Sequence, residues 1–172
     1  MNTELLLFVL VGGLPVVLSY LWYGWWSNTQ FTFDYLQGPF KGTSLMLWQL
    51  STLLVVISYV YMLVEFVDNP LTDTQKNILY PSYILFLSTA SQYTIYSTVD
   101  LYNARKSYML LFNLLLTALG SLGFFIVASI EAAKSNEPFT LLMAGTLWIF
   151  IHHFCLDAVV WYRFWKPEYS LP

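Results

Sequence analysis

The chain has 172 residues, of which 58% are hydrophobic, 19% are aromatic and 10% are charged, with a net charge of −3. A soluble domain carries about 25% charged residues, so this composition indicates a membrane protein rather than an ordinary soluble one. The small net charge provides no basic patch, which argues against nucleic-acid binding. The single cysteine, Cys155, excludes an intrachain disulfide and a cysteine-rich metal site.

Charged residues divide the chain into long apolar runs. A transmembrane helix needs about 20 mostly apolar residues to cross a hydrocarbon core about 30 Å thick. The runs predict an all-α, polytopic membrane helix bundle that forms a single membrane-embedded domain over 1–172. Its five transmembrane helices are expected at about 5–23, 44–67, 79–99, 107–130 and 139–162. We therefore expect an integral, multi-pass membrane protein in contact with membrane lipids.

The connections between these helices predict an orientation. The longest one, 24–43, is rich in aromatic residues, and we expect it to be an interfacial loop lying against the lipid headgroups. Lysine and arginine gather after the first and third helices and after the fifth, as Lys41, Arg105, Lys106, Arg163 and Lys166, whereas the other two loops hold one lysine each. Short basic loops stay in the cytoplasm, which predicts an outside N-terminus and an inside C-terminus.

His153 and Asp157 give the fifth predicted helix its clearest candidate catalytic site. Residues four apart lie on one face of an α-helix, and a carboxylate one turn from an imidazole can orient the ring and raise its basicity. Ionisable residues inside a membrane span are costly and are functional-site candidates by default. We therefore expect His153 to act as a base supported by Asp157. The alternative is that the pair only joins helices, with Asp157 bound to Arg163 or to a neighbouring helix.

His152 and His153 are also candidates for cofactor binding, because a single axial histidine can hold a haem or a chlorophyll. The sequence leaves the identity of any cofactor or metal unknown. Two histidines are too few for a histidine-rich di-iron centre. Successive residues of an α-helix point about 100° apart, which predicts that the two histidines do not share one metal ion.

Polar residues mark two other predicted helices. One face of the third is lined by Thr89, Gln92, Tyr96 and Asp100. We expect this face to turn toward protein or water, and Glu65 adds a carboxylate in the outer third of the second helix. The polar intramembrane face could line a permeation path or form hydrogen bonds between helices. Gly120 and Gly123 predict close packing of the fourth helix against a neighbour.

These features leave three functions open. The favoured one is a small helical subunit or assembly factor of a larger membrane complex, whose polar faces bind other subunits, further copies of the chain, lipid or a hydrophobic cofactor. The second is an intramembrane enzyme that acts on a lipid-like substrate through His153 and Asp157, completed by Glu65 or Tyr96. The third is a channel or carrier subunit in which the polar third helix lines the path.

Overall fold

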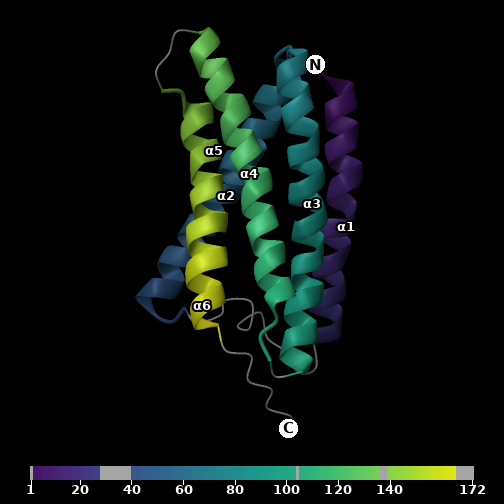
Figure 1. The fold of residues 1–172 in the computed structure, drawn as a ribbon, viewed down its shortest axis with the longest axis vertical. Helices are drawn as coiled ribbons and strands as arrows, with labels where there is room; N and C mark the ends of the chain where they lie inside the picture. The colour runs from purple at the N-terminus through teal and green to yellow at the C-terminus, as the bar shows by residue number, and fades with distance from the viewer. Residues whose placement is uncertain (1, 28–39, 104, 136–138, 166–172) are drawn as a thin grey trace.

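The computed structural model describes residues 2–27, 40–103, 105–135 and 139–165, and all the regular structure in these ranges is helical. The helices are α1 (Thr3–Ser27), α2 (Thr43–Asp68), α3 (Asp73–Tyr102) and α4 (Tyr108–Lys134), followed by a last helix in three segments, α5 (Leu141–Ile151), η2 (His152–Trp161) and α6 (Tyr162–Phe164) (Figure 1). The prediction of an all-helical fold is confirmed for the described residues.

Four helical stretches are long and apolar enough to cross a membrane: Thr3–Trp22, Thr43–Asp68, Tyr108–Lys134 and Leu141–Phe164. These four support a membrane protein. α3 has 30 residues and is long enough to cross a bilayer. Its many polar residues make it less apolar than these four stretches, so it is not one of them. Five spans and the direction of insertion therefore stay predictions.

Two predicted boundaries differ from the structure. α3 begins at Asp73 rather than near 79, because Thr72 and Gln75 form a reciprocal cap in which the Gln75 side-chain oxygen accepts from the Thr72 backbone N–H at 2.9 Å. α1 continues to Ser27, so residues 24–27 of the predicted interfacial loop are helical. The central part of that loop, 28–39, lies outside the described residues.

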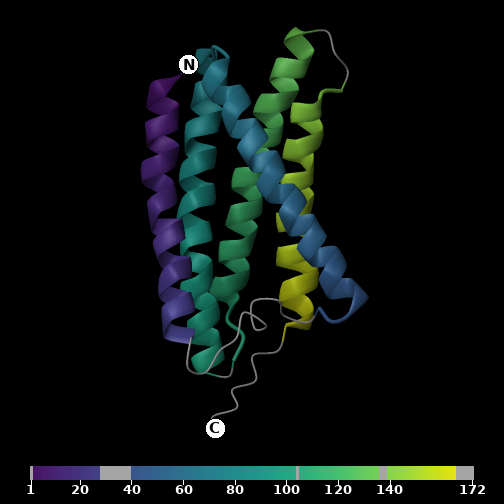
Figure 2. The ribbon, with the colours of Figure 1, turned by 180° about the vertical axis from the view of Figure 1, so that it is seen from behind.

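The helices form one bundle in which α1, α3, α4 and the last helix lie side by side (Figure 1). Figure 2 shows α2 running obliquely across one face of this row, where it contacts α5 and η2. Aromatic rings fill the space beneath the crossing. The Tyr59 ring stacks on the Phe86 ring with their centres 5.8 Å apart, and the ring centres of Phe124 and Tyr83 are 4.7 Å apart. The core thus lies between the row of helices and the oblique helix.

Close contact between α3 and α4 confirms the packing predicted from the two glycines. A Cβ atom on Gly120 would lie 2.8 Å from the Phe86 backbone nitrogen and 2.9 Å from the Ser82 carbonyl oxygen, and one on Gly123 would overlap the Ser82 side chain. Small residues let helix backbones approach in this way. α4 therefore has a fixed position against α3.

The turn between α3 and α4 fixes the end of the last helix. Asp100 accepts hydrogen bonds from the backbone N–H and the hydroxyl of Ser107, at 2.7 and 2.9 Å. Lys106 Nζ donates to the carbonyl oxygens of Tyr162 and Arg163, two of the carbonyls that a helix end leaves without helical partners. These contacts hold α6, which continues directly from η2, against the turn that precedes α4.

Candidate functional site

The last helix widens at the two histidines. Over His152–Trp161 it is a π-helix, in which backbone hydrogen bonds join residues five apart rather than four. The bond from the Tyr162 N–H to the Asp157 carbonyl shows this spacing at the end of the segment. One wide turn therefore separates His152 from Asp157, which are also five residues apart.

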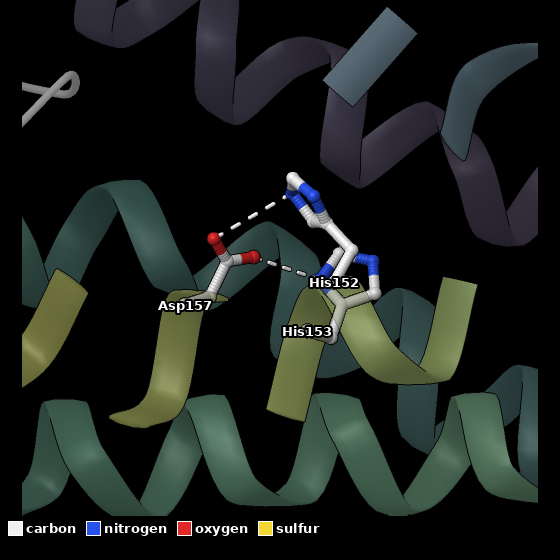
Figure 3. Close-up of side chains that lie close together, drawn as sticks. All are labelled: His152, His153 and Asp157. Carbon is white, nitrogen blue, oxygen red and sulfur yellow. Dashed lines mark hydrogen bonds and ion pairs between the residues drawn. The ribbon is translucent and has the colours of Figure 1, made fainter. Parts of the chain in front are cut away.

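This wide turn brings His152, His153 and Asp157 together (Figure 3). His153 Nδ1 lies 2.9 Å from Asp157 Oδ2, and His152 Nε2 lies 3.6 Å from Asp157 Oδ1. One potential ligand atom from each residue falls within 4.8 Å of the other two. The predicted divergence of the two histidines is wrong, because it assumed α-helical geometry throughout, whereas both rings lie beside Asp157.

Contacts from α2 fix the His152 ring. Its Nδ1 lies 2.7 Å from the hydroxyl oxygen of Ser51, and the Trp48 ring lies 6.2 Å from the imidazole, centre to centre. The His152 side chain is 3% exposed. Because Nδ1 is hydrogen-bonded to Ser51, Nε2 is the nitrogen directed at Asp157.

His153 has one engaged and one free nitrogen. A proton on Nδ1 makes the contact with Asp157 a hydrogen bond and leaves a lone pair on Nε2. Nε2 is buried and has no hydrogen-bond partner among the described residues, and the ring packs edge-on against Phe86 at 5.2 Å. Buried polar atoms are usually paired. In this tautomer Nε2 is the atom that can accept a proton; with the proton on Nε2 instead, the lone pair of Nδ1 faces Asp157 and can bind a metal.

A cavity of about 290 Å³ adjoins the three residues. The other residues that line it in the described part of the chain come from α1, α2, α3 and α4 and are uncharged at neutral pH: Tyr20, Trp48, Thr52, Ala90, Tyr93, Leu114 and Thr117. The volume lies near the lower end of the range of about 300–1,000 Å³ that is usual for ligand pockets. A ligand in this cavity would meet aromatic, aliphatic and hydroxyl groups beside one cluster of ionisable ones.

The predicted polar face of α3 is divided by the structure. Thr89 is buried and accepts a hydrogen bond from the Thr117 hydroxyl of α4 at 2.8 Å. Asp100 is buried in the turn described above, whereas Gln92 is exposed and Tyr96 is half-buried. None of the four lines the cavity. Within the described residues they do not form one continuous polar path.

Glu65 lies away from the candidate site. It is near the end of α2, where its carboxylate accepts a hydrogen bond from the Asn69 side chain at 3.0 Å. Neither Glu65 nor Tyr96 lines the cavity beside His153. The residues that do complete the surroundings of the histidines, Ser51 and Trp48, were not predicted as site residues, because no sequence pattern connects them with a helix about 100 residues later.

The arrangement can support two kinds of chemistry. A carboxylate that orients an imidazole makes a general base, and two imidazoles with one carboxylate make a three-ligand metal site with open positions. Both require a space beside these residues that a substrate can occupy, and the cavity is lined by all three of them. Comparison of the chain with protein-family models, with curated proteins and with solved structures finds no match.

Proposed function

We propose that this chain is an integral membrane enzyme that acts on an apolar, lipid-like substrate held in the cavity, with His152, His153 and Asp157 as its reactive centre. The observation that carries the proposal is the convergence of these three side chains on one cavity wall. Perturbed or converging ionisable groups in the main pocket of a protein are the usual mark of an active site.

The depth of the cluster supports an apolar substrate. His152 comes 11 residues after the first residue of the apolar stretch Leu141–Phe164, which corresponds to about 16 Å along a helix. That is close to half the thickness of a hydrocarbon core of about 30 Å. A polar metabolite would have to leave water to reach this depth, whereas a lipid already resides there.

The cost of placing these residues there also supports a reactive role. A charged side chain at the centre of a membrane span costs about 2.5–3.5 kcal/mol on insertion scales, and Asp157 lies five residues after His152, about 7.5 Å nearer the end of the span, where part of this cost remains. Hydrogen bonding between helices can be achieved at lower cost with neutral residues, as the bond between Thr89 and Thr117 demonstrates. The carboxylate is therefore best explained by its chemistry rather than by packing.

The test compares the lipids of one host expressing either the wild-type chain or His153→Gln. Glutamine keeps a polar side chain but has no basic lone pair, so we expect the wild type to convert one lipid species into another and the variant to convert none. Glu131→Gln, at the far end of α4, is the matched control and should convert as the wild type does. Identical lipid profiles for wild type, folded His153→Gln and a host without the protein would contradict the proposal.

Membership of a larger membrane assembly stays a prediction, and one observation favours it. Gln92 is exposed on α3, and no described residue bonds its side-chain amide. It lies 10 residues before the end of α3 at Tyr102, or about 15 Å along the helix. At such a depth an amide gains from a hydrogen bond with another helix, so this face suits a partner subunit or a second copy.

A further inference from the structure

The geometry points to a single divalent transition-metal ion, of the iron(II) or zinc(II) type, held by His152, His153 and Asp157 with an open position toward the cavity. This inference rests on the proposed function, since it names the cofactor of the same reactive centre. Two neutral imidazoles and one carboxylate are the donor set of many non-haem iron(II) and catalytic zinc sites.

The separations between the potential ligand atoms suit one ion. Zinc binds imidazole nitrogen and carboxylate oxygen at about 2.0–2.2 Å, so two ligands of one ion lie up to about 4 Å apart. His152 Nε2 and Asp157 Oδ1 are 3.6 Å apart, which is too long for a good hydrogen bond and suitable for two ligands. All three donors fall within 4.8 Å, so small side-chain rotations bring them around one centre.

The negative charge of Asp157 also supports a bound cation. Among the described residues its carboxylate pairs with the two histidines, and no lysine or arginine pairs with it. Asp157 is half-buried, with 17% of its side chain exposed, and a charge withdrawn from water in this way is usually paired or bound to a metal ion. A neutral His153 supplies one hydrogen bond but no positive charge, whereas a divalent ion would neutralise the carboxylate and bind the lone pair that Nδ1 of His153 carries when the ring proton is on Nε2.

The contact with Ser51 prepares His152 for this role. Histidine ligands usually engage their second nitrogen in a hydrogen bond, which fixes the tautomer and the orientation of the ring. Ser51 lies 2.7 Å from Nδ1 and leaves Nε2 as the ligand atom. The cavity then lies where a water molecule or a substrate would complete the coordination.

The experiment measures metal binding directly, without an activity assay. Full-length protein in lipid nanodiscs is treated with a chelator and titrated with cobalt(II), whose visible absorption reports coordination, and then with zinc(II) as a competitor. We expect one cobalt per chain and its displacement by zinc. Asp157→Asn and His152→Gln should weaken binding by more than about 100-fold, which exceeds the loss typical of a residue that only orients a ligand.

Glu131→Gln is the control, because it removes a carboxylate from the cluster with Gln75 and Lys134 at the far end of α4; it should bind cobalt as the wild type does. Failure of the wild type to bind cobalt or zinc would overturn the inference, and so would equal binding by wild type and Asp157→Asn. If the chelator-treated wild type binds neither ion yet still converts lipid, the metal inference fails and the proposed function survives. If metal binds as expected but no lipid is converted, the proposed function fails while the metal site stands.

Discussion

His152 is fixed by residues on two different helices. Its Nδ1 contacts the Ser51 hydroxyl on α2, and its Nε2 is directed at Asp157 on its own helix. α2 and η2 also approach each other through the rings of Trp48 and His152. The position of one imidazole therefore depends on how the oblique helix crosses the bundle, and Ser51 is a positioning residue for the proposed metal.

The first prediction concerns Ser51→Ala, which removes the hydroxyl and leaves the backbone and Cβ in place. We expect cobalt affinity to fall by about 10–100-fold, the loss typical of a group that orients a metal-bound histidine. Ser58→Ala, two turns further along α2 and outside the cavity lining, is the control and should bind cobalt normally. Unchanged affinity in folded Ser51→Ala would show that the hydroxyl does not orient the ring.

The π-helical segment decides the geometry of the site at the scale of the element. In an α-helix, His153 would lie one turn from Asp157 and His152 would point elsewhere. The wider turn adds His152 to the same group while it keeps the contact between His153 and Asp157. π-helical turns occur frequently at functional sites, which agrees with the role proposed for this segment.

This segment also explains which part of the site the sequence could predict. His153 and Asp157 follow the four-residue spacing of an α-helix, so their contact was predictable and the structure contains it. The approach of His152 to Asp157 could not be predicted, because hydrophobic periodicity does not distinguish a π-helical stretch from an α-helical one. The long apolar runs predicted the helices well, but the cap formed by Thr72 and Gln75 was overlooked and α3 was predicted too short.

The packing of α4 on α3 leads to the second prediction of this section. In Gly120→Ala the new methyl group would press against the Phe86 nitrogen and the Ser82 carbonyl oxygen, which are backbone atoms and cannot move independently. We expect the free energy of unfolding to fall by about 1–3 kcal/mol. Thermal unfolding in detergent measures this change.

Gly13→Ala in α1 is the matched control, because a Cβ there meets nothing within 4 Å. Alanine has the higher helix propensity by about 1 kcal/mol, so this variant should be as stable as the wild type or slightly more stable. Equal stability of Gly120→Ala and Gly13→Ala would show that α3 and α4 do not pack as closely as described.

At the scale of the whole molecule, charge is distributed unequally between the two ends of the bundle. The end where α1 and α3 begin and α2 and α4 finish holds five carboxylates, Glu4, Glu65, Asp68, Asp73 and Glu131, and two lysines, Lys76 and Lys134. Hydrogen bonds from Asn2 to Val67 and from Gln75 to Glu131 join these helix ends. The opposite end holds Arg105 and Lys106 in the turn between α3 and α4, and Arg163 in α6. The structure thus brings Arg105, Lys106 and Arg163, which the sequence assigns to separate connections, to one end of the bundle.

The number of spans depends on α3, the most polar of the long helices. It lies between α1 and α4 in the bundle (Figure 1), so a membrane that surrounds those two helices also surrounds α3. The buried hydroxyls of Ser82, Thr89, Ser97 and Thr98 donate to backbone carbonyls of α3, and Thr89 also accepts from Thr117 of α4, whereas those of Tyr83 and Thr94 have no partner among the described residues. Most of the buried hydroxyls are thus satisfied without water. Neighbouring helices can therefore carry this polar helix across a bilayer, although its composition alone would not.

The last prediction tests five spans and the orientation together. In a Cys155→Ser background, Lys76→Cys, Arg105→Cys and Lys134→Cys place one thiol at the start of α3, between α3 and α4, and at the end of α4. Because basic loops stay in the cytoplasm, we expect a membrane-impermeant maleimide to label positions 76 and 134 on intact cells and position 105 only after lysis.

Labelling of position 105 alone on intact cells would reverse the orientation. Labelling of 76 and 105 from the same side would mean that α3 does not cross the membrane, and the histidine cluster would then lie in a bundle of four spans.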